Sequence, residues 1–126
     1  MSTGRRVGLV AAFGYAGEGL RDAFRSQRNF RIHLAFAMAV TALCIWLRLP
    51  PVHTGLLALT IGAVLVTEVL NSALEALVDL VSPDYHPLAK RVKDLMAASV
   101  LLAALSSVVV GLVILGPPLL ALVGLR

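Results

Sequence analysis

The sequence predicts an all-α membrane protein with an N-terminal amphipathic surface helix and three transmembrane helices. Two observations lead to this fold class. First, 59% of the 126 residues are hydrophobic and 14% are charged, whereas a water-soluble domain carries about 25% charged residues. Second, the apolar residues form long runs that are separated by breaks containing proline. We therefore expect one membrane domain that covers residues 1–126.

The surface helix is expected at residues 7–28. On a helical projection, four large apolar residues of this segment fall within roughly a 60° arc, and charged residues face away from it. The four are Leu9, Phe13, Leu20 and Phe24. A secretory signal also starts with basic residues and an apolar run, but here charged residues interrupt the run from Glu18 onward. That interruption favours a helix lying along the membrane surface.

The three transmembrane helices are expected at residues 31–48, 54–80 and 88–115. Pro50-Pro51 separates the first two, because consecutive prolines remove two backbone donors and interrupt a helix. A short polar loop with two further prolines separates the second helix from the third. Gly116-Pro117-Pro118 is expected to end the third helix.

Basic residues gather on one side of these predicted helices. Of the eleven lysines and arginines, all except Arg48 and Arg126 lie before the first transmembrane helix, at its start, or at the start of the third. The positive-inside rule then places the N-terminus and the loop before the third helix in the cytoplasm. The net charge of +4 could also indicate nucleic-acid binding, but these residues flank apolar runs and do not cover an aromatic-rich surface. We therefore expect no nucleic-acid partner.

A polar stripe follows one face of the second predicted transmembrane helix. Its four members fall within roughly 80° of one another on a helix and extend over about 16 Å of its axis. They are Glu68, Asn71, Glu75 and Asp79. A carboxylate inside a membrane costs about 2.5 to 3.5 kcal/mol on insertion scales, so three on one face need partner groups, a metal ion or water. The stripe therefore predicts a functional site at the boundary between lipid and water.

A basic face on the third predicted helix lies across the polar loop from this stripe. His86, Lys90, Lys93 and Asp94 share that face if the helix begins early enough to include His86. Carboxylates and an amide opposite lysines are the groups needed to hold Mg²⁺ and a polyphosphate. One further carboxylate could remove the proton from a hydroxyl nucleophile. The sequence has no P-loop and no protein-kinase signature, so neither of those folds is expected.

Three motifs follow one another in the second half of the chain. They read Glu68-x-x-Asn71-Ser72-x-x-Glu75-x-x-x-Asp79, then Tyr85-His86, then Ala89-Lys90-x-x-Lys93-Asp94. In this order they strongly resemble the small prokaryotic diacylglycerol kinase and undecaprenol kinase family, and the resemblance covers nearly the whole chain. It implies Mg²⁺-dependent transfer of the γ-phosphoryl group of ATP to the hydroxyl of a membrane lipid. It also implies a homotrimer in the bacterial cytoplasmic membrane, with cytoplasmic active sites shared between neighbouring subunits.

The resemblance implies roles for individual residues. Glu68 would be the general base for the lipid hydroxyl, and Glu75 would coordinate Mg²⁺. Gln27 stands where much of the family has a glutamate as a second metal ligand. Its amide oxygen can coordinate but adds no charge, so either the metal affinity is lower or another acid, such as Glu18, helps. The ATP-binding region would contain Asn71, Asp79, His86, Lys93 and Asp94, with Lys93 on the phosphates.

The sequence also bears on which lipid accepts the phosphoryl group. The segment from Arg28 to His33 looks more like the undecaprenol kinase branch of the family, which favours a polyprenol. Asn29 and Arg31 in this segment, together with Ser72, are expected in the substrate region. The alternative within the family is a diacylglycerol kinase that makes phosphatidic acid.

Two readings from other classes also fit a short helical membrane protein with acidic residues. A proton-coupled exporter would use intramembrane glutamates as a proton relay, but it would need its main carboxylate near the bilayer midplane. Here the acidic residues crowd one interface. A purely structural membrane adaptor is the third option, and the cost of three carboxylates on an intramembrane face argues against it.

Overall fold

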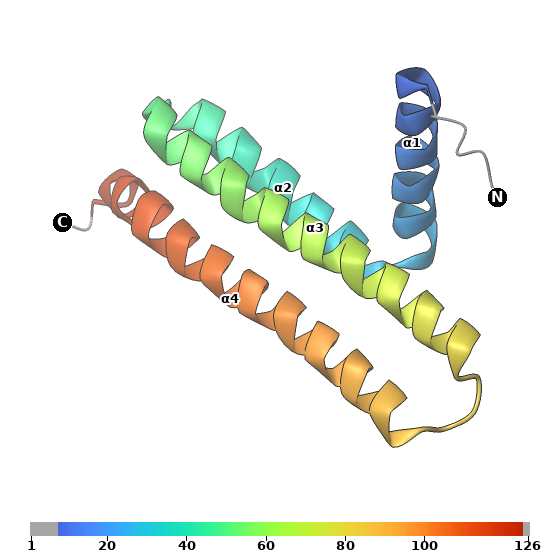
Figure 1. Ribbon diagram of the computed structural model, residues 1–126. Helices are drawn as coiled ribbons and strands as arrows, with labels where there is room; N and C mark the ends of the chain where they lie inside the picture. Colours follow the sequence, from blue (N-terminus) through green and yellow to red (C-terminus); the bar gives the residue numbers. More distant parts are fainter. Residues whose placement is uncertain (1–7, 125–126) are drawn as a thin grey trace.

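The computed structural model describes residues 8–124, which form four α-helices and contain no strand. The helices are α1 (Leu9–Ser26), α2 (Arg28–Trp46), α3 (Pro51–Val81) and α4 (Pro87–Leu122). Figure 1 shows α2, α3 and α4 as long neighbouring rods and α1 as a helix that stands apart from them. The predicted all-α fold is confirmed. Three of the basic residues counted for the orientation, Arg5, Arg6 and Arg126, lie outside the described residues.

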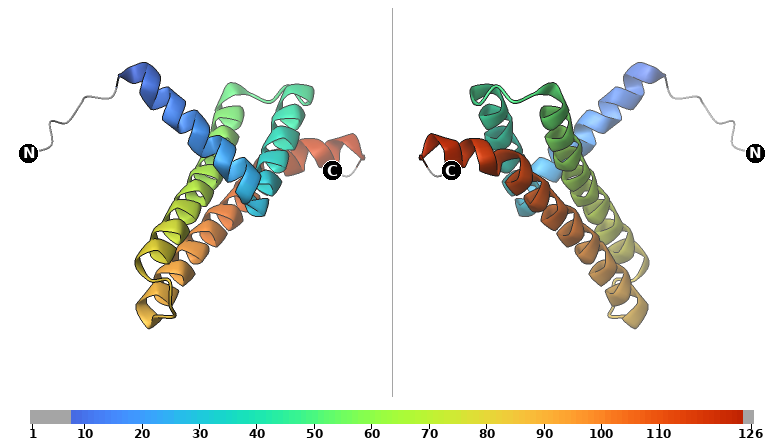
Figure 2. Two further views of the ribbon diagram at one scale, coloured as in Figure 1. Left: turned by 90° about the vertical axis from the view of Figure 1, so that its right-hand side faces the viewer. Right: turned by 90° about the vertical axis from the view of Figure 1, so that its left-hand side faces the viewer.

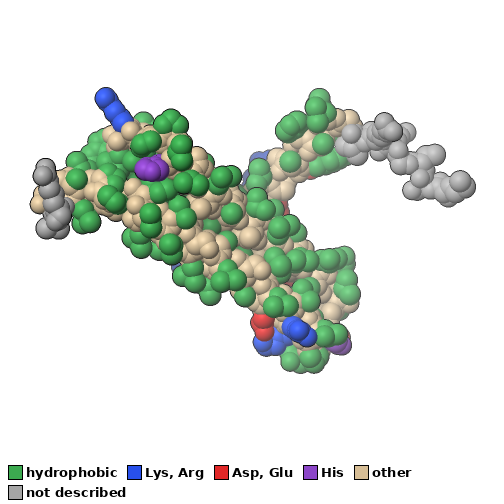
Figure 3. Space-filling view, turned by 60° about the vertical axis from the view of Figure 1, so that its left-hand side comes forward, with side chains coloured by type: hydrophobic (Ala, Val, Ile, Leu, Met, Phe, Trp, Pro, Cys, Tyr) green, Lys and Arg blue, Asp and Glu red, His purple; other side chains and the backbone are tan. Residues whose placement is uncertain are grey.

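The helices α2, α3 and α4 are each long and apolar enough to cross a membrane. The shortest, α2, has 19 residues, which at about 1.5 Å per residue nearly matches the hydrocarbon thickness of roughly 30 Å. Within the apolar window of each helix, only 11% to 17% of the residues are buried by the rest of the chain. The remaining apolar side chains are available to lipid or to other chains, as Figure 3 shows for one face of the molecule. The three spans predicted from the sequence are thus confirmed by length and composition.

Helix α1 has the amphipathic character that was predicted. Ala23 is its only buried residue among those described. Large apolar side chains such as Leu9 and Phe13 are exposed in the folded chain. An exposed apolar face on a helix that projects from the bundle suits contact with a membrane surface.

The apolar core lies at the end of the bundle where α2 meets α3 and where α4 approaches both. Cys44 from α2, Leu57 from α3, and Ile114 and Leu115 from α4 form one buried cluster. Cys44 therefore has the packing role expected of a small apolar side chain. The opposite end of the bundle, beside the loop between α3 and α4, contains the polar residues of the predicted site.

The turn between α2 and α3 differs from the prediction by three residues. Pro50 is the N-cap of α3 and Pro51 is its first residue, whereas the sequence suggested a start at Thr54. Proline fits the first turn of a helix, because the N–H that it lacks would have no intrahelical partner there. Arg48, two residues before Pro50, has a φ of 49°. This left-handed backbone conformation lets the chain turn sharply before α3 begins.

The expected end of the last helix at Gly116-Pro117-Pro118 is wrong. Helix α4 continues through both prolines to Leu122, and Figure 2 shows that its C-terminal end runs in a different direction from the rest. Each proline removes one backbone hydrogen bond and bends the helix. Packing offsets this loss, because Leu115 before the prolines is buried in the core and Leu119 after them packs against it.

The joint between α1 and α2 is fixed by Arg31. Its Nη1 atom donates hydrogen bonds to the carbonyl oxygens of Phe24 and Arg25, both at 3.1 Å. These carbonyls belong to the last turn of α1, where the helix dipole also favours a cation. Gln27, with an extended backbone, is the single residue between the two helices. Arg31, which was predicted in the substrate region, thus caps α1 with its guanidinium.

Exchanging Arg31→Met should loosen the last turn of α1, because two charged hydrogen bonds to its carbonyls are lost. We expect local opening to become easier by about 1 to 2 kcal/mol, seen as faster hydrogen–deuterium exchange in residues 23–27. Arg28→Met is the matched control, since no side-chain hydrogen bond of Arg28 is found within the described residues. Equal exchange in the two variants would contradict the capping role.

Candidate active site

A polar cleft of about 410 Å³ lies where α3, α4 and their connecting loop meet. Four of the five residues predicted for the ATP region line it, and Tyr85 and Lys90 lie beside them. The four are Asp79, His86, Lys93 and Asp94. The structure thus brings the end of the acidic stripe and the basic face together, although they are separated along the chain by the loop.

Two ion pairs lie in this polar cleft, one between α3 and α4 and one within α4. Lys93 on α4 donates to Asp79 on α3, and Lys90 donates to Asp94 one turn further along α4. Both pairs are well exposed: the side chains of Lys93 and Asp79 are 41% and 65% accessible to solvent. An exposed pair contributes only about 0 to 1 kcal/mol. A polyphosphate that enters the cleft can therefore take over either lysine without a large loss of stability.

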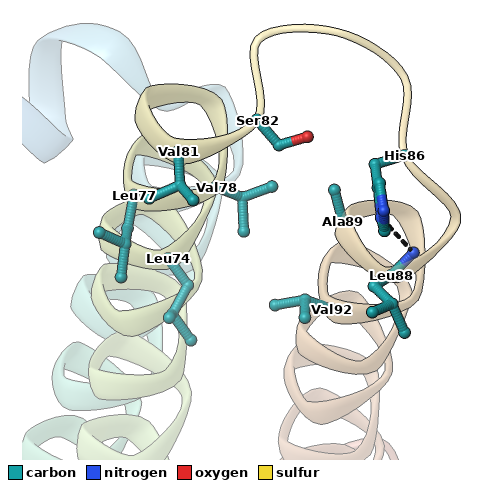
Figure 4. Close-up of a pocket in the computed structure, with 9 residues that line it drawn as sticks. All are labelled: Leu74, Leu77, Val78, Val81, Ser82, His86, Leu88, Ala89 and Val92. Carbon is teal, nitrogen blue, oxygen red and sulfur yellow. Dashed lines mark hydrogen bonds between the residues drawn. The ribbon is translucent and has the colours of Figure 1, made fainter.

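His86 holds the start of α4 and does not belong to its helical face. It is the N-cap, and its Nδ1 accepts a hydrogen bond from the backbone N–H of Leu88 at 3.2 Å. Figure 4 shows this contact above an apolar cavity whose walls are side chains of α3 and α4. Because Nδ1 is engaged in the cap, Nε2 is the ring nitrogen that remains for a ligand. The sequence could not distinguish this cap from a first helical residue.

Glu68 lies away from the polar cleft and is buried. It is 2% exposed and is the only buried charged or polar residue among those described. The Nε2 atom of His33, on α2, lies 3.2 Å from Oε1 of Glu68. The orientation of the two side chains does not make this contact a hydrogen bond, and Oε1 has no other partner within the described residues. The two side chains therefore lie within ion-pair distance without a hydrogen bond between them.

His33 was not among the residues predicted for the site. Periodicity within one helix cannot find it, because it faces Glu68 from a different helix. The sequence feature that could have found it is its distance from the turn. His33 lies 17 residues before Pro50, and Glu68 lies 18 residues after Pro50. In an antiparallel helix pair these two positions lie at the same height.

Asn71 and Glu75 lie between Glu68 and the cleft. The Asn71 amide donates to Oε1 of Glu75 at 3.0 Å, and Oδ1 of Asn71 is buried with no hydrogen-bond partner among residues 8–124. Ser72, predicted in the substrate region, donates its hydroxyl to the backbone oxygen of Glu68 at 3.0 Å. The hydroxyl proton of Ser72 is thus used in a hydrogen bond within α3.

The oxygen atoms of Asn71 and Glu75 suit a hard cation. Mg²⁺ is bound through one or two carboxylates, and waters and phosphate oxygens supply its other ligands. Within residues 8–124 there is no group of three or more His, Cys, Asp or Glu side chains that could hold a metal. One chain therefore provides an open, partial set of oxygen ligands, which fits Mg²⁺ delivered with a nucleotide. Gln27 is half-buried at the joint between α1 and α2, and Asn29 is exposed in the first turn of α2.

Comparison with known families decides the classification. Residues 14–115 match the profile of the family described as prokaryotic diacylglycerol kinase. The chain belongs to this family. Membership confirms, at the level of the family, the predicted ATP-dependent membrane lipid kinase.

Individual relatives carry two different names. The chain is 48% identical over 115 residues to a diacylglycerol kinase of Synechocystis, a match that covers 90% of this chain. It spans 66% of that relative, slightly less than two thirds of its length. The chain is also 38% identical to the undecaprenol kinase of Bacillus subtilis and 36% identical to the diacylglycerol kinase of Escherichia coli K12. These two matches cover 86% and 85% of this chain and 88% of each relative. The predicted preference for undecaprenol is not confirmed by these relatives.

The exposed Lys93–Asp79 pair should matter little for folding. We expect Lys93→Met to change the free energy of unfolding by no more than about 1 kcal/mol, measured by denaturant unfolding in detergent micelles. Lys90→Met, which removes the other pair, is the matched comparison. A loss of several kcal/mol in Lys93→Met alone would show that the pair clamps α3 to α4 and is not free to bind a ligand.

Proposed function

We propose that this chain is a Mg²⁺-dependent kinase that transfers the γ-phosphoryl group of ATP to a hydroxyl group of a membrane lipid. The observation that carries this proposal is the sequence of environments along α3. Glu68 is buried among apolar helices, whereas Asp79, eleven residues further, lies in a polar cleft with two lysines. A lipid alcohol needs the apolar environment, and a nucleotide needs the polar cleft. The two environments follow one another along the same helix. Membership of the family supports the same reaction.

Each residue of the site has a proposed role in the reaction. Lys93 and Lys90 hold the phosphates in the polar cleft, and His86 and Asp94 line the rest of the nucleotide site. Glu68 accepts the proton of the lipid hydroxyl. The lipid oxygen then forms a bond to the γ-phosphorus, the bond from that phosphorus to the β–γ bridging oxygen breaks, and ADP leaves with the electron pair. No phosphoenzyme is formed.

Glu75 and Asn71 are the proposed metal ligands between the base and the cleft, and Gln27 is the proposed further ligand. Mg²⁺ held there would neutralise charge on the phosphate oxygens during transfer. Gln27 contributes an oxygen without a charge, so Glu75 is the main electrostatic contribution of the protein to the metal. The orphaned Oδ1 of Asn71 is the observation that supports a ligand at this position.

We also propose a homotrimer with active sites completed by neighbouring chains. One chain buries few of the residues in its three spans. Its base and its cleft are separated by about 16 Å along α3, calculated from eleven residues. A neighbouring α3 or α4 would both cover apolar surface and bring a second set of polar groups to the base. The basic residues at the start of α2 and α4 support a cytoplasmic site in a bacterial cytoplasmic membrane.

Two acceptor lipids are supported by different observations. The 48% identity to the Synechocystis protein supports diacylglycerol, since that relative is named diacylglycerol kinase. The segment from Arg28 to His33, which looks like the undecaprenol kinase branch, supports undecaprenol. We take diacylglycerol as the first acceptor to test, because the identity extends over 115 residues and not over a short segment.

The direct test offers diacylglycerol and undecaprenol side by side to the purified protein in bilayers with labelled ATP and Mg²⁺. We expect labelled lipid, with the higher kcat/KM for diacylglycerol. Glu68→Gln should reduce turnover by at least about 100-fold while the oligomer stays intact, and Asp22→Asn on α1 is the matched control that keeps the activity. No labelled product from either lipid, together with proton flux into liposomes, would replace the kinase with an exporter. A higher kcat/KM for undecaprenol would reverse the order of the acceptors.

Glu75→Ala should raise the Mg²⁺ concentration needed for half-maximal activity by about 10-fold or more, since a charged metal ligand is lost. The measurement is a Mg²⁺ titration of lipid phosphorylation at saturating ATP, with Asp22→Ala as the control. An unchanged titration would remove Glu75 from the metal site.

A further inference from the structure

Among the described residues, His33 is the one basic side chain that reaches Glu68. Its Nε2 atom lies 3.2 Å from Oε1 of Glu68, across the interface between α2 and α3. Within the described residues, no lysine, no arginine and no other histidine lies within 4.0 Å of a Glu68 oxygen, whether from α1, α2, α3 or α4. The state of this carboxylate therefore depends on one partner.

The two side chains differ in their access to solvent. The Glu68 side chain is 3% exposed and that of His33 is 25% exposed. A carboxylate this deeply buried loses its contacts with water, and a nearby polar group has to replace them. Oε1 of Glu68 has no hydrogen-bond partner within the described residues, and the imidazole of His33 is the polar group beside it. The orientation of the Glu68 carboxylate therefore depends on His33.

We propose that His33 is a positioning residue for Glu68: its imidazole lies against the buried carboxylate and directs it toward the lipid hydroxyl. This inference rests on the proposed lipid kinase function and assigns part of that activity to a residue on α2. His33 does not itself exchange a proton with the lipid, which passes its hydroxyl proton to Glu68 alone.

The surroundings of His33 support this role. Besides its contact with Glu68, His33 lines an apolar cavity of about 400 Å³ between α2, α3 and α4. Phe36, Val64 and Val108 are among the residues around this cavity. In such surroundings the electrostatic interaction between imidazole and carboxylate is screened little by water.

The test compares His33→Leu and His33→Gln with the wild-type enzyme. His33→Leu should lower kcat by about 10-fold to 100-fold with little change in the KM for ATP or lipid. His33→Gln should recover part of this loss, since its amide can still place a polar group beside the carboxylate. His53→Leu, at the opposite end of α3, is the matched control and should behave as wild type.

Two results would overturn the proposal. One is a kcat for His33→Leu within about twofold of wild type. The other is an equal loss of kcat in His33→Leu and His33→Gln, accompanied by a matching rise in both KM values, which would mark a purely structural role. If His33→Leu does not fold, the comparison between His33→Gln and wild type decides in the same way.

A stability cycle separates this inference from the proposed function. The free energy of unfolding is measured for wild type, His33→Gln, Glu68→Gln and the double variant. We expect His33→Gln to destabilise the wild-type protein more than the Glu68→Gln protein, because the interaction is absent in the latter. Equal effects would show that the pair is not coupled. If wild type phosphorylates no lipid, the proposed function fails, and the cycle still reports whether His33 and Glu68 interact.

Discussion

The interaction on which the rest of the structure depends is the buried contact between Glu68 and His33. A carboxylate in an apolar helix layer costs about 2.5 to 3.5 kcal/mol, and such a side chain persists only with a partner. The hairpin of α2 and α3 provides the partner at the same height, because the turn at Pro50 and Pro51 gives the two helices nearly equal lengths from the turn to the pair. The apolar core around Cys44 and Leu57 holds the other end of that hairpin.

Exposure increases along α3 from this contact toward the loop. Glu68 is buried, Asn71 and Glu75 are half-buried, and Asp79 is exposed in the polar cleft. One helix face thus runs from an environment suited to a lipid to an environment suited to a polyphosphate. His86, as the cap of α4, places Lys90 and Lys93 opposite the exposed end of that face. This arrangement is what the proposed reaction between a membrane lipid and a nucleotide requires.

Helical periodicity was sufficient to predict the stripe on α3 and the basic face of α4 across the loop from it. It depends only on rotation within a helix and on a short loop between two helices. The contact of His33 with Glu68 needed more information, because it depends on the register between two helices. The same limit applies to Arg31, whose partners are carbonyl oxygens of a different helix. The continuation of α4 through Pro117 and Pro118 was missed for another reason: local propensity was outweighed by the packing of Leu115 and Leu119 on the core.

The central claim is that the buried contact between His33 and Glu68 is part of the working site. The most direct measurement is kcat for lipid phosphorylation in wild type, His33→Gln, Glu68→Gln and the double variant. The account predicts that His33→Gln lowers kcat in the wild-type background and causes no further loss in the Glu68→Gln background. A loss of the same size in both backgrounds would contradict it.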